Sequence, residues 1–319
     1  MNQKKAKMNS IIETEDLGKH YREVKAVEHL FLRVKEGEIY SFLGLNGAGK
    51  TTTIRMLLGM IKPTTGYANV LGTRVKLGSI DPWKDVGYLV ETPSSYPELT
   101  VRENLEVARR LHPGTPRQAV GIIIERLGLS EYADRRSGNL SLGNVQRLGL
   151  ANALIHQPKL IFLDEPTNGL DPAGIVEIRE LLLELTRDHG ATVFMSSHIL
   201  AEVARLAQRI GIIHNGYLLQ ELNVDELEHN RNRRLLLKTN DLQAAQQLLE
   251  QTGYTSEVLA EGKLELRQSG AVDHPDEINS LLVKAGNFPT QVLVEEEELE
   301  QYFLRLVGMD GGSKNATLI

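Results

Sequence analysis

The chain of 319 residues contains no cysteine. Without thiols it can form no disulfide, no thiolate zinc site and no iron–sulfur cluster, and it has no thiol nucleophile. This absence fits a reducing compartment such as the cytosol. Cysteine chemistry is therefore excluded from every functional hypothesis that follows.

Long apolar runs and an excess of positive charge are also missing. Runs such as 160–163 and 122–124 are far shorter than the roughly 20 residues of a membrane-spanning helix. Residues 1–10 carry three lysines, but no apolar stretch follows, so no secretory signal is expected. With 36 basic and 42 acidic residues, the chain lacks the electrostatic footprint of a dedicated nucleic-acid binder. We expect a soluble intracellular polypeptide.

Length and composition predict about two domains with at least one large core, because 41% of the residues are hydrophobic. Apolar runs at 39–43, 160–163 and 192–195 are typical of buried parallel strands. Helical periodicity follows them, which indicates an α/β domain. Between 93 and 157 strand patterns disappear and helical ones take over, so we expect a helical insertion.

A charged stretch, 225–234, is expected to be a domain boundary or linker without an apolar face. The order of patterns after it is βαββαβ, which predicts a small ferredoxin-like α+β domain over 226–308. Its expected elements are a strand at 235–238, a helix from Asp241, strands at 257–259 and 264–266, a helix from Asp276, and a strand at 291–294. The acidic run 295–298 is interpreted as the solvated start of a last helix, 297–306, and 309–319 as a flexible tail.

A glycine-rich loop follows the first predicted strand and precedes a predicted helix. Gly44-Leu45-Asn46-Gly47-Ala48-Gly49-Lys50-Thr51 fits the pattern GxxxxGK[ST]. The glycines let backbone N–H groups point into one concavity, where the helix dipole also favours anions. Lys50 is expected to reach the β- and γ-phosphates, and the Thr51 hydroxyl to bind Mg²⁺. We predict a phosphate site built from Gly44, Asn46, Gly47, Ala48, Gly49, Lys50, Thr51 and Thr52.

Two carboxylates, Asp164 and Glu165, follow the strand 160–163 at the sheet edge where the loop is expected. Successive strand residues point opposite ways, so the two side chains are expected to have different roles. Asp164 suits Mg²⁺, directly or through a water, and Glu165 suits orienting and deprotonating an attacking water. A solvated strand end with a helix-capping acid is the alternative, which the adjacent loop disfavours.

A third motif connects these residues to a family. Leu140-Ser141-Leu142-Gly143-Asn144-Val145-Gln146-Arg147 resembles the LSGGQ signature of the ATP-binding subunits of ABC transporters, with Leu142 and Asn144 departing from that pattern. The resemblance covers roughly residues 1–225. It implies a P-loop ATPase fold with an inserted helical subdomain, ATP and Mg²⁺ as ligands, and ATP hydrolysis. It also implies that Ser141 and the Gly143 amide contact ATP held by the opposite subunit.

Other residues match the family in the expected order. Asn168-Gly169-Leu170-Asp171 resembles its D-loop, and Ser197-His198 resembles the switch histidine that contacts the γ-phosphate and Glu165. Tyr21 resembles the aromatic residue that stacks on adenine, although an ordinary half-buried tyrosine is the alternative. Glu91 stands where the family usually has a glutamine that contacts Mg²⁺ and the membrane partner. A carboxylate can still bind a hard cation, so Glu91 is kept as a metal-site residue.

The resemblance implies a subunit that powers a separate membrane permease from the inner face of the cell membrane. The segment from Glu91 to Val101 is then expected to receive a coupling helix of that permease. The chain is similar to the drug and antibiotic exporter branch, including bacitracin-resistance ATP-binding proteins. The working pair is either a homodimer or a heterodimer with a homologous subunit. The alternatives are a non-transport ATPase of the same superfamily and a regulatory module that closes on ATP with little hydrolysis.

Overall fold

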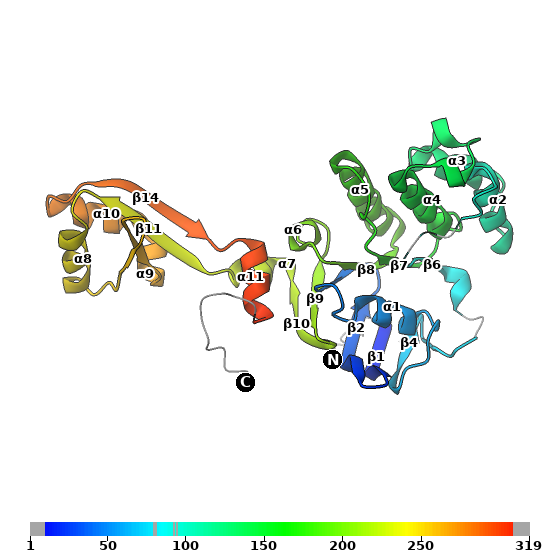
Figure 1. The fold of residues 1–319 in the computed structure, drawn as a ribbon, viewed down its shortest axis with the longest axis horizontal. Helices are drawn as coiled ribbons and strands as arrows, with labels where there is room; N and C mark the ends of the chain where they lie inside the picture. Colours follow the sequence, from blue (N-terminus) through cyan, green and yellow to red (C-terminus); the bar gives the residue numbers. More distant parts are fainter. Residues whose placement is uncertain (1–9, 79–81, 92, 94, 309–319) are drawn as a thin grey trace, which may run out of the picture. The chain divides into compact units, whose positions relative to one another are not determined.

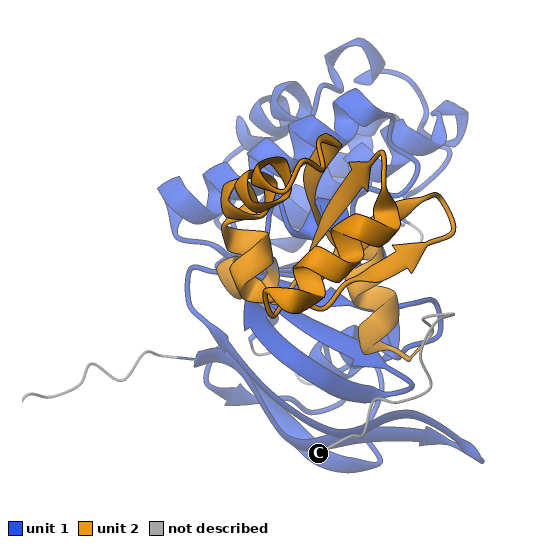
Figure 2. Ribbon diagram, turned by 90° about the vertical axis from the view of Figure 1, so that its left-hand side faces the viewer, with its two compact units in different colours: residues 1–224 blue, residues 225–319 orange. Residues whose placement is uncertain are grey.

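The computed structural model describes residues 10–78, 82–91, 93 and 95–308. The predicted tail, 309–319, lies outside the described residues. The chain divides into two compact units, residues 1–224 and 225–319, which Figure 2 colours separately. Within the described part of the chain, every helix is too short or too polar to cross a membrane.

A six-stranded sheet forms the centre of unit 1, in the order β10-β9-β3-β8-β7-β6 (Figure 1). Its strands are β3 (Ile39–Leu43), β6 (Val86–Leu89), β7 (Leu160–Asp164), β8 (Thr192–Ser197), β9 (Arg209–His214) and β10 (Tyr217–Asn223). Neighbouring strands from β9 to β6 are parallel, and only β10 runs antiparallel. All residues of β3, β7 and β8 are buried, as their continuous apolar runs predict.

A second, antiparallel sheet in unit 1 has the order β2-β1-β4-β5. Its strands are β1 (Ser10–Tyr21), β2 (Val24–Lys35), β4 (Thr65–Val70) and β5 (Thr73–Arg74). In β2 the buried residues Leu30, Leu32 and Val34 alternate with exposed ones, so one face of this sheet packs inward. That face shares a single hydrophobic core with Phe42 and Phe162 of the central sheet.

The helices of unit 1 follow or connect the strands of its two sheets, and η marks a short 3₁₀ helix. They are α1 (Lys50–Leu57), η1 (Trp83–Asp85), α2 (Val101–Leu111), α3 (Ala119–Arg126), η2 (Ser130–Tyr132), η3 (Ser137–Asn139), α4 (Leu142–Leu154), α5 (Pro172–His189) and α6 (Leu200–Val203). The described residues between 95 and 157 form helices and turns, as predicted, with one isolated bridge between Thr100 and Arg136. Thr100 and Glu103 close a reciprocal capping box that fixes the start of α2.

Unit 2 is an antiparallel sheet in the order β12-β13-β11-β14 with helices. Its elements are α7 (Val224–His229), β11 (Arg233–Thr239), α8 (Leu242–Gln251), β12 (Glu257–Leu259), β13 (Lys263–Leu266), α9 (Ser269–Asp273), α10 (Pro275–Lys284), β14 (Pro289–Glu296) and α11 (Leu299–Leu306). Leu235 and Leu237 of β11 pack with Leu249 and Ile278 of two helices in a core of its own. The four strands and the helices α8, α10 and α11 overlap segments expected from the sequence, whereas α7 and α9 were not expected.

Two charged segments of unit 2 differ from expectation. The stretch 225–234 begins at the boundary between the two units. The expectation that it has no apolar face is wrong, because α7 buries Leu227 completely and β11 already begins at Arg233. The acidic run 295–298 is not a solvated helix start. Glu295 lies in β14, where cross-strand pairing places it beside Arg234, and the carboxylate of Glu297 is mostly buried against Arg305. Glu295 and Glu296 are ion-paired because β11 supplies Arg234 and Arg233 at the opposing positions, whereas the partner of Glu297 comes from α11.

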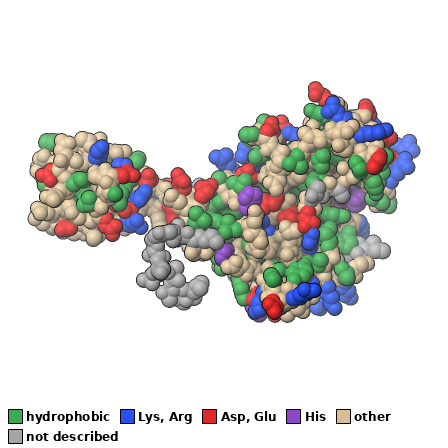
Figure 3. All heavy atoms as spheres, viewed as in Figure 1, with side chains coloured by type: hydrophobic (Ala, Val, Ile, Leu, Met, Phe, Trp, Pro, Cys, Tyr) green, Lys and Arg blue, Asp and Glu red, His purple; other side chains and the backbone are tan. Residues whose placement is uncertain are grey.

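Charged side chains of both signs are interspersed over the face that Figure 3 shows. Several form ion pairs on the helical part of unit 1, such as Glu106 with Arg109 and Arg110, and Arg126 with Glu184. Exposed pairs of this kind contribute about 0–1 kcal/mol each to stability. The stability of unit 1 therefore rests mainly on its buried core.

Two stacked imidazoles should make the stability of unit 1 depend on pH. The rings of His112 and His156 lie 3.6 Å apart, and burial lowers the pKa of His156 to about 4. Unfolded histidine has a pKa near 6.5, so between pH 6.5 and 4 the unfolded chain binds more protons than the folded chain does. The free energy of unfolding therefore decreases as the pH is lowered through this range. We expect the urea midpoint to drop less between pH 7 and pH 4.5 in His156→Phe than in the wild type. The exposed His189→Gln should keep the wild-type profile, and an equally steep profile for His156→Phe would contradict this assignment.

Candidate functional site

The glycine-rich loop joins β3 to α1 and lines a cavity of about 200 Å³. Its residues 45–52 form the wall together with Ala26 and Glu165. Gly49 has a φ of 111°, and a Cβ there would lie 2.5 Å from the carbonyl oxygen of Ala26, so only glycine fits. Because α1 begins at Lys50, its first backbone N–H groups have no partner within the helix and can bind an anion.

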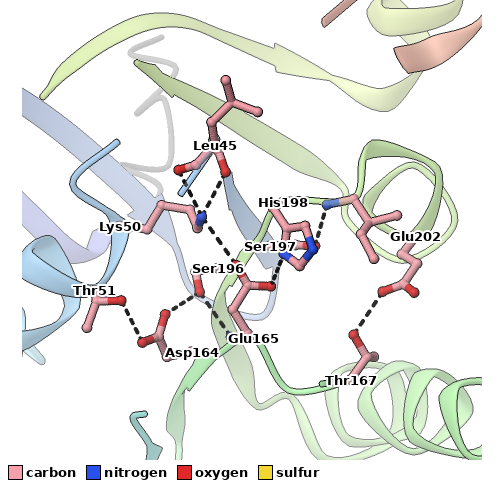
Figure 4. A network of polar contacts seen from close by, with 12 residues as sticks. Leu45, Lys50, Thr51, Asp164, Glu165, Thr167, Ser196, Ser197, His198 and Glu202 are labelled. Carbon is pink, nitrogen blue, oxygen red and sulfur yellow. Dashed lines mark hydrogen bonds and ion pairs between the residues drawn. The ribbon is translucent and has the colours of Figure 1, made fainter. Parts of the chain in front are cut away.

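Lys50 places a buried cation in this cavity. Its side chain is only 6% exposed, and its Nζ lies 2.7 Å from the carbonyl oxygen of Gly44 and 3.2 Å from Oε1 of Glu165 (Figure 4). A buried ammonium needs compensating negative charge, which Glu165 supplies here. Phosphate oxygens in the cavity would compete with Glu165 for the same ammonium.

Side-chain oxygens from α1, β7 and β8 meet at Asp164. The Thr51 hydroxyl of α1 donates to Oδ2 at 2.7 Å, and the Ser196 hydroxyl of β8 donates to Oδ1 at 2.5 Å. Within the described ranges, no group of three or more His, Asp or Glu side chains could hold a metal by itself. Mg²⁺ typically takes one or two protein oxygens and completes its shell with water and substrate phosphates. The pair of Thr51 and Asp164 fits that requirement.

Glu165 lies just beyond the end of β7 and has a positive φ of 51°. Its carboxylate is 19% exposed and contacts Lys50 through Oε1 and His198 Nδ1, at 2.8 Å, through Oε2. The two neighbouring carboxylates do point to different partners, but strand alternation is not the reason. The left-handed backbone at Glu165 turns its side chain toward the cavity, a conformation that costs about 1–3 kcal/mol and is concentrated at functional sites.

Two site residues were not predicted from the sequence. Ser196 connects the Asp164 carboxylate to the backbone of Glu165, since its hydroxyl donates to Asp164 and accepts a hydrogen bond from the Glu165 N–H at 3.0 Å. Gln146, on the buried side of α4, donates to the carbonyl oxygen of Pro166 at 3.0 Å. The available signals were a pair of serines ending an apolar strand and a glutamine two residues after Asn144. Neither residue type alone specifies a contact to Glu165 or its neighbours.

Removing the Ser196 hydroxyl should destabilise the protein. Ser196→Ala leaves Asp164 and the Glu165 N–H without their buried partner, which costs about 1–3 kcal/mol for an unsatisfied group. The matched control is Ser41→Ala on β3, because the buried Ser41 hydroxyl has no hydrogen-bond partner in the described structure. Urea unfolding should show a lower midpoint for Ser196→Ala and little change for Ser41→Ala. Equal midpoints for the two variants would contradict the bridging role.

The predicted signature and D-loop residues pack against each other rather than on the cavity. Residues 142–144 form the first turn of α4, and Ser141 caps it by accepting from the Asn144 N–H. Leu142 packs closely on Gly169, because a Cβ added to Gly169 would lie 2.7 Å from the Leu142 side chain. Asp171 caps the first turn of α5 in the same way. None of these residues is among those that line the cavity.

Tyr21 and Glu91 also lie outside the cavity wall. Tyr21 ends β1, is 45% exposed, and has the Lys19 ammonium 5.0 Å from its ring centroid. Glu91 is half exposed and forms an ion pair with Arg55 of α1. The structure therefore brings together Lys50, Thr51, Asp164, Glu165 and His198, but not these two residues.

The comparisons with known proteins agree with this geometry. A model of the ABC transporter family matches residues 27–168, from β2 through the signature to the D-loop. The bacitracin transport ATP-binding protein BcrA of Bacillus licheniformis is 41% identical over 303 residues, 94% of this chain and 98% of that protein. The chain is an ATP-binding subunit of the ABC transporter family.

Further relatives of this ABC subunit support its ATPase activity. The lantibiotic transport ATP-binding protein SrtF of Streptococcus pyogenes is 34% identical over 219 residues, 69% of this chain and 93% of that protein. Two solved structures share its fold. An ATP-binding subunit of an ABC transporter matches 69% of this chain and 92% of its own, with a TM-score of 0.64 and 29% identity. A dimeric ATP-binding cassette bound to ADP and phosphate matches 67% and 98%, with a TM-score of 0.63 and 25% identity.

Proposed function

We propose that this ABC subunit hydrolyses MgATP with Glu165 as the general base and His198 as the residue that orients it. The observation that carries this proposal is the position of the Glu165 carboxylate, which is held at the cavity between Lys50 and His198. A bound Mg²⁺, held by Thr51 and Asp164, would neutralise charge on the β- and γ-phosphates. The glycine-rich loop would supply backbone N–H donors to the same oxygens.

The residues would act in a defined order. When a triphosphate enters the cavity, its oxygens take over the Lys50 ammonium, which releases Oε1 of Glu165 toward solvent. That oxygen then accepts a proton from a water whose oxygen bonds to the γ-phosphorus, while the bond to the bridging oxygen breaks and ADP leaves. His198 keeps the other carboxylate oxygen in place. Positioning and charge stabilisation dominate this type of reaction.

We further propose that two subunits work head to tail, each ATP lying between the loop of one and the signature of the other. The separation of Ser141 from the cavity of its own chain supports this arrangement. The dimeric cassette among the similar solved structures supports it as well. The pair is either two copies of this chain or this chain with a homologous subunit.

The proposed partner is a membrane permease that docks near residues 91–101 and places the subunit on the inner face of the cell membrane. Tyr96 in this segment and Tyr88, which precedes it on β6, are exposed and offer apolar contact area. The names of the relatives favour bacitracin-like or lantibiotic peptides as exported cargo. Unit 2 is proposed to be an accessory domain of the ferredoxin-like class.

The export proposal predicts a resistance phenotype. Disrupting the gene in its native host should lower the minimal inhibitory concentration of bacitracin or a lantibiotic, and the wild-type gene should restore it while Glu165→Gln should not. Restoration by Glu165→Gln would instead favour a regulatory module that needs ATP binding but little hydrolysis. An unchanged inhibitory concentration after disruption would remove these peptides as cargo.

A further inference from the structure

An ion-pair cluster outside the predicted site surrounds Glu28 of β2. The Glu28 side chain is only 7% exposed, with the Lys25 ammonium at 2.8 Å and His20 Nε2 at 3.5 Å. The hydroxyl of Tyr217, on β10, donates a short hydrogen bond to its other oxygen. The hydrogen bonds from Lys25 and Tyr217 lower the pKa of Glu28 despite its burial. The carboxylate therefore joins β1, β2 and β10 at one point.

The cluster is adjacent in the β1–β2 hairpin to Tyr21, the residue that the family resemblance assigns to stacking on adenine. In the β1–β2 hairpin, His20 pairs with Lys25, and the next pair toward the turn is Tyr21 with Val24. Two of the three groups that contact Glu28 thus belong to the pair adjacent to Tyr21. A shift of the carboxylate would move this pair and, through the backbone of the hairpin, the adjacent Tyr21.

The same strand is fixed to the phosphate loop by its backbone. The Glu28 N–H donates to the carbonyl oxygen of Gly216 at 2.9 Å, and the Gly216 N–H donates to the carbonyl oxygen of Ala48 in the loop at 3.0 Å. Gly216 is followed by Tyr217, whose strand β10 packs beside β2 (Figure 1). Ala26, between Lys25 and Glu28, lines the phosphate cavity itself.

We propose that Glu28 and Tyr217 are positioning residues that set where Tyr21 stands relative to the phosphate loop, and thereby how tightly the adenine ring is bound. The proposal rests on the stacking role assigned to Tyr21. The backbone bonds through Gly216 hold the strand to the loop without the side chains. The Glu28–Tyr217 contact instead fixes the hairpin end that carries Tyr21. Base binding and triphosphate binding should therefore respond differently to its loss.

Two ligands separate these contributions in the full-length chain: MgATP, which has a base, and inorganic tripolyphosphate with Mg²⁺, which has none. Tyr217→Phe and Glu28→Gln should weaken MgATP binding by about three- to tenfold, since they misplace a stacking contact without removing it. Tripolyphosphate affinity should stay within about twofold of the wild type. The KM for ATP should rise in parallel, with kcat at saturating MgATP unchanged. Tyr132→Phe, on the helical segment, is the matched control and should change none of these values.

The outcomes are distinguishable. Equal weakening of MgATP and tripolyphosphate would overturn the proposal, because Glu28 would then hold the phosphate loop. Wild-type MgATP affinity in both variants, or a lower kcat with unchanged KM, would overturn it too. Tyr21→Ala is measured alongside and should weaken MgATP more than Tyr217→Phe does. If Tyr21→Ala binds MgATP normally, the role of Tyr21 fails together with the proposal, whereas hydrolysis by Glu165 is untouched.

Discussion

Glu165→Gln is expected to lower the rate of ATP hydrolysis by about 10²- to 10⁴-fold while ATP still binds. This corresponds to a barrier higher by about 3 to 5.5 kcal/mol. Glutamine keeps the size of the side chain but cannot accept the proton of the attacking water. Binding should survive because Lys50, Thr51 and the loop are unchanged. Phosphate release under saturating MgATP measures the first effect, and equilibrium binding of labelled ATP measures the second.

The matched control for this variant is Glu202→Gln. Glu202 lies on α6 near the same sheet edge, but its carboxylate accepts a hydrogen bond from Thr167 at 2.9 Å and does not contact Lys50 or His198. Its hydrolysis rate should stay close to that of the wild type. A Glu165→Gln protein that hydrolyses ATP at nearly the wild-type rate would remove Glu165 from the general-base role.

Lys50→Met should weaken ATP binding by about 30- to 5,000-fold. The ammonium is buried in the phosphate cavity, and truncating one partner of a buried, hydrogen-bonded charge pair costs about 2–5 kcal/mol. Removing it also leaves Glu165 facing the triphosphate with an uncompensated negative charge. The control is Lys159, an exposed lysine. Lys159→Met changes the net charge by the same amount and should bind ATP normally. Comparable affinity in the two variants would contradict the assignment of Lys50.

Much of the site followed from the sequence because its residues stand at the ends of apolar strands. The runs 39–43 and 160–163 predict parallel buried strands, and the carboxyl ends of such strands share one edge. Lys50, Asp164 and Glu165 were therefore expected to converge, and the structure brings them together. The contact of His198 with Glu165 also appears as expected.

The parts that were missed depend on contacts between distant segments. The antiparallel sheet of β1, β2, β4 and β5 alternates buried with exposed residues, a weaker signal than a continuous apolar run. Glu28 and Tyr217 are 189 positions apart, and nothing in either local sequence indicates their contact. Leu227 was overlooked because a single apolar residue among charges gives no periodic pattern. Glu91 faces Arg55, a pairing that the motif around it does not specify.

The pairing of two phosphate sites is tested most directly by the mass of the Glu165→Gln protein in solution. Light scattering after size exclusion should give a dimer with MgATP and a monomer with MgADP, because in the proposed pair the γ-phosphate connects the loop of one subunit to the signature of the other. Wild-type turnover, measured in parallel, should be present. A Glu165→Gln protein that binds MgATP yet remains a monomer would contradict a site shared between two copies of this chain.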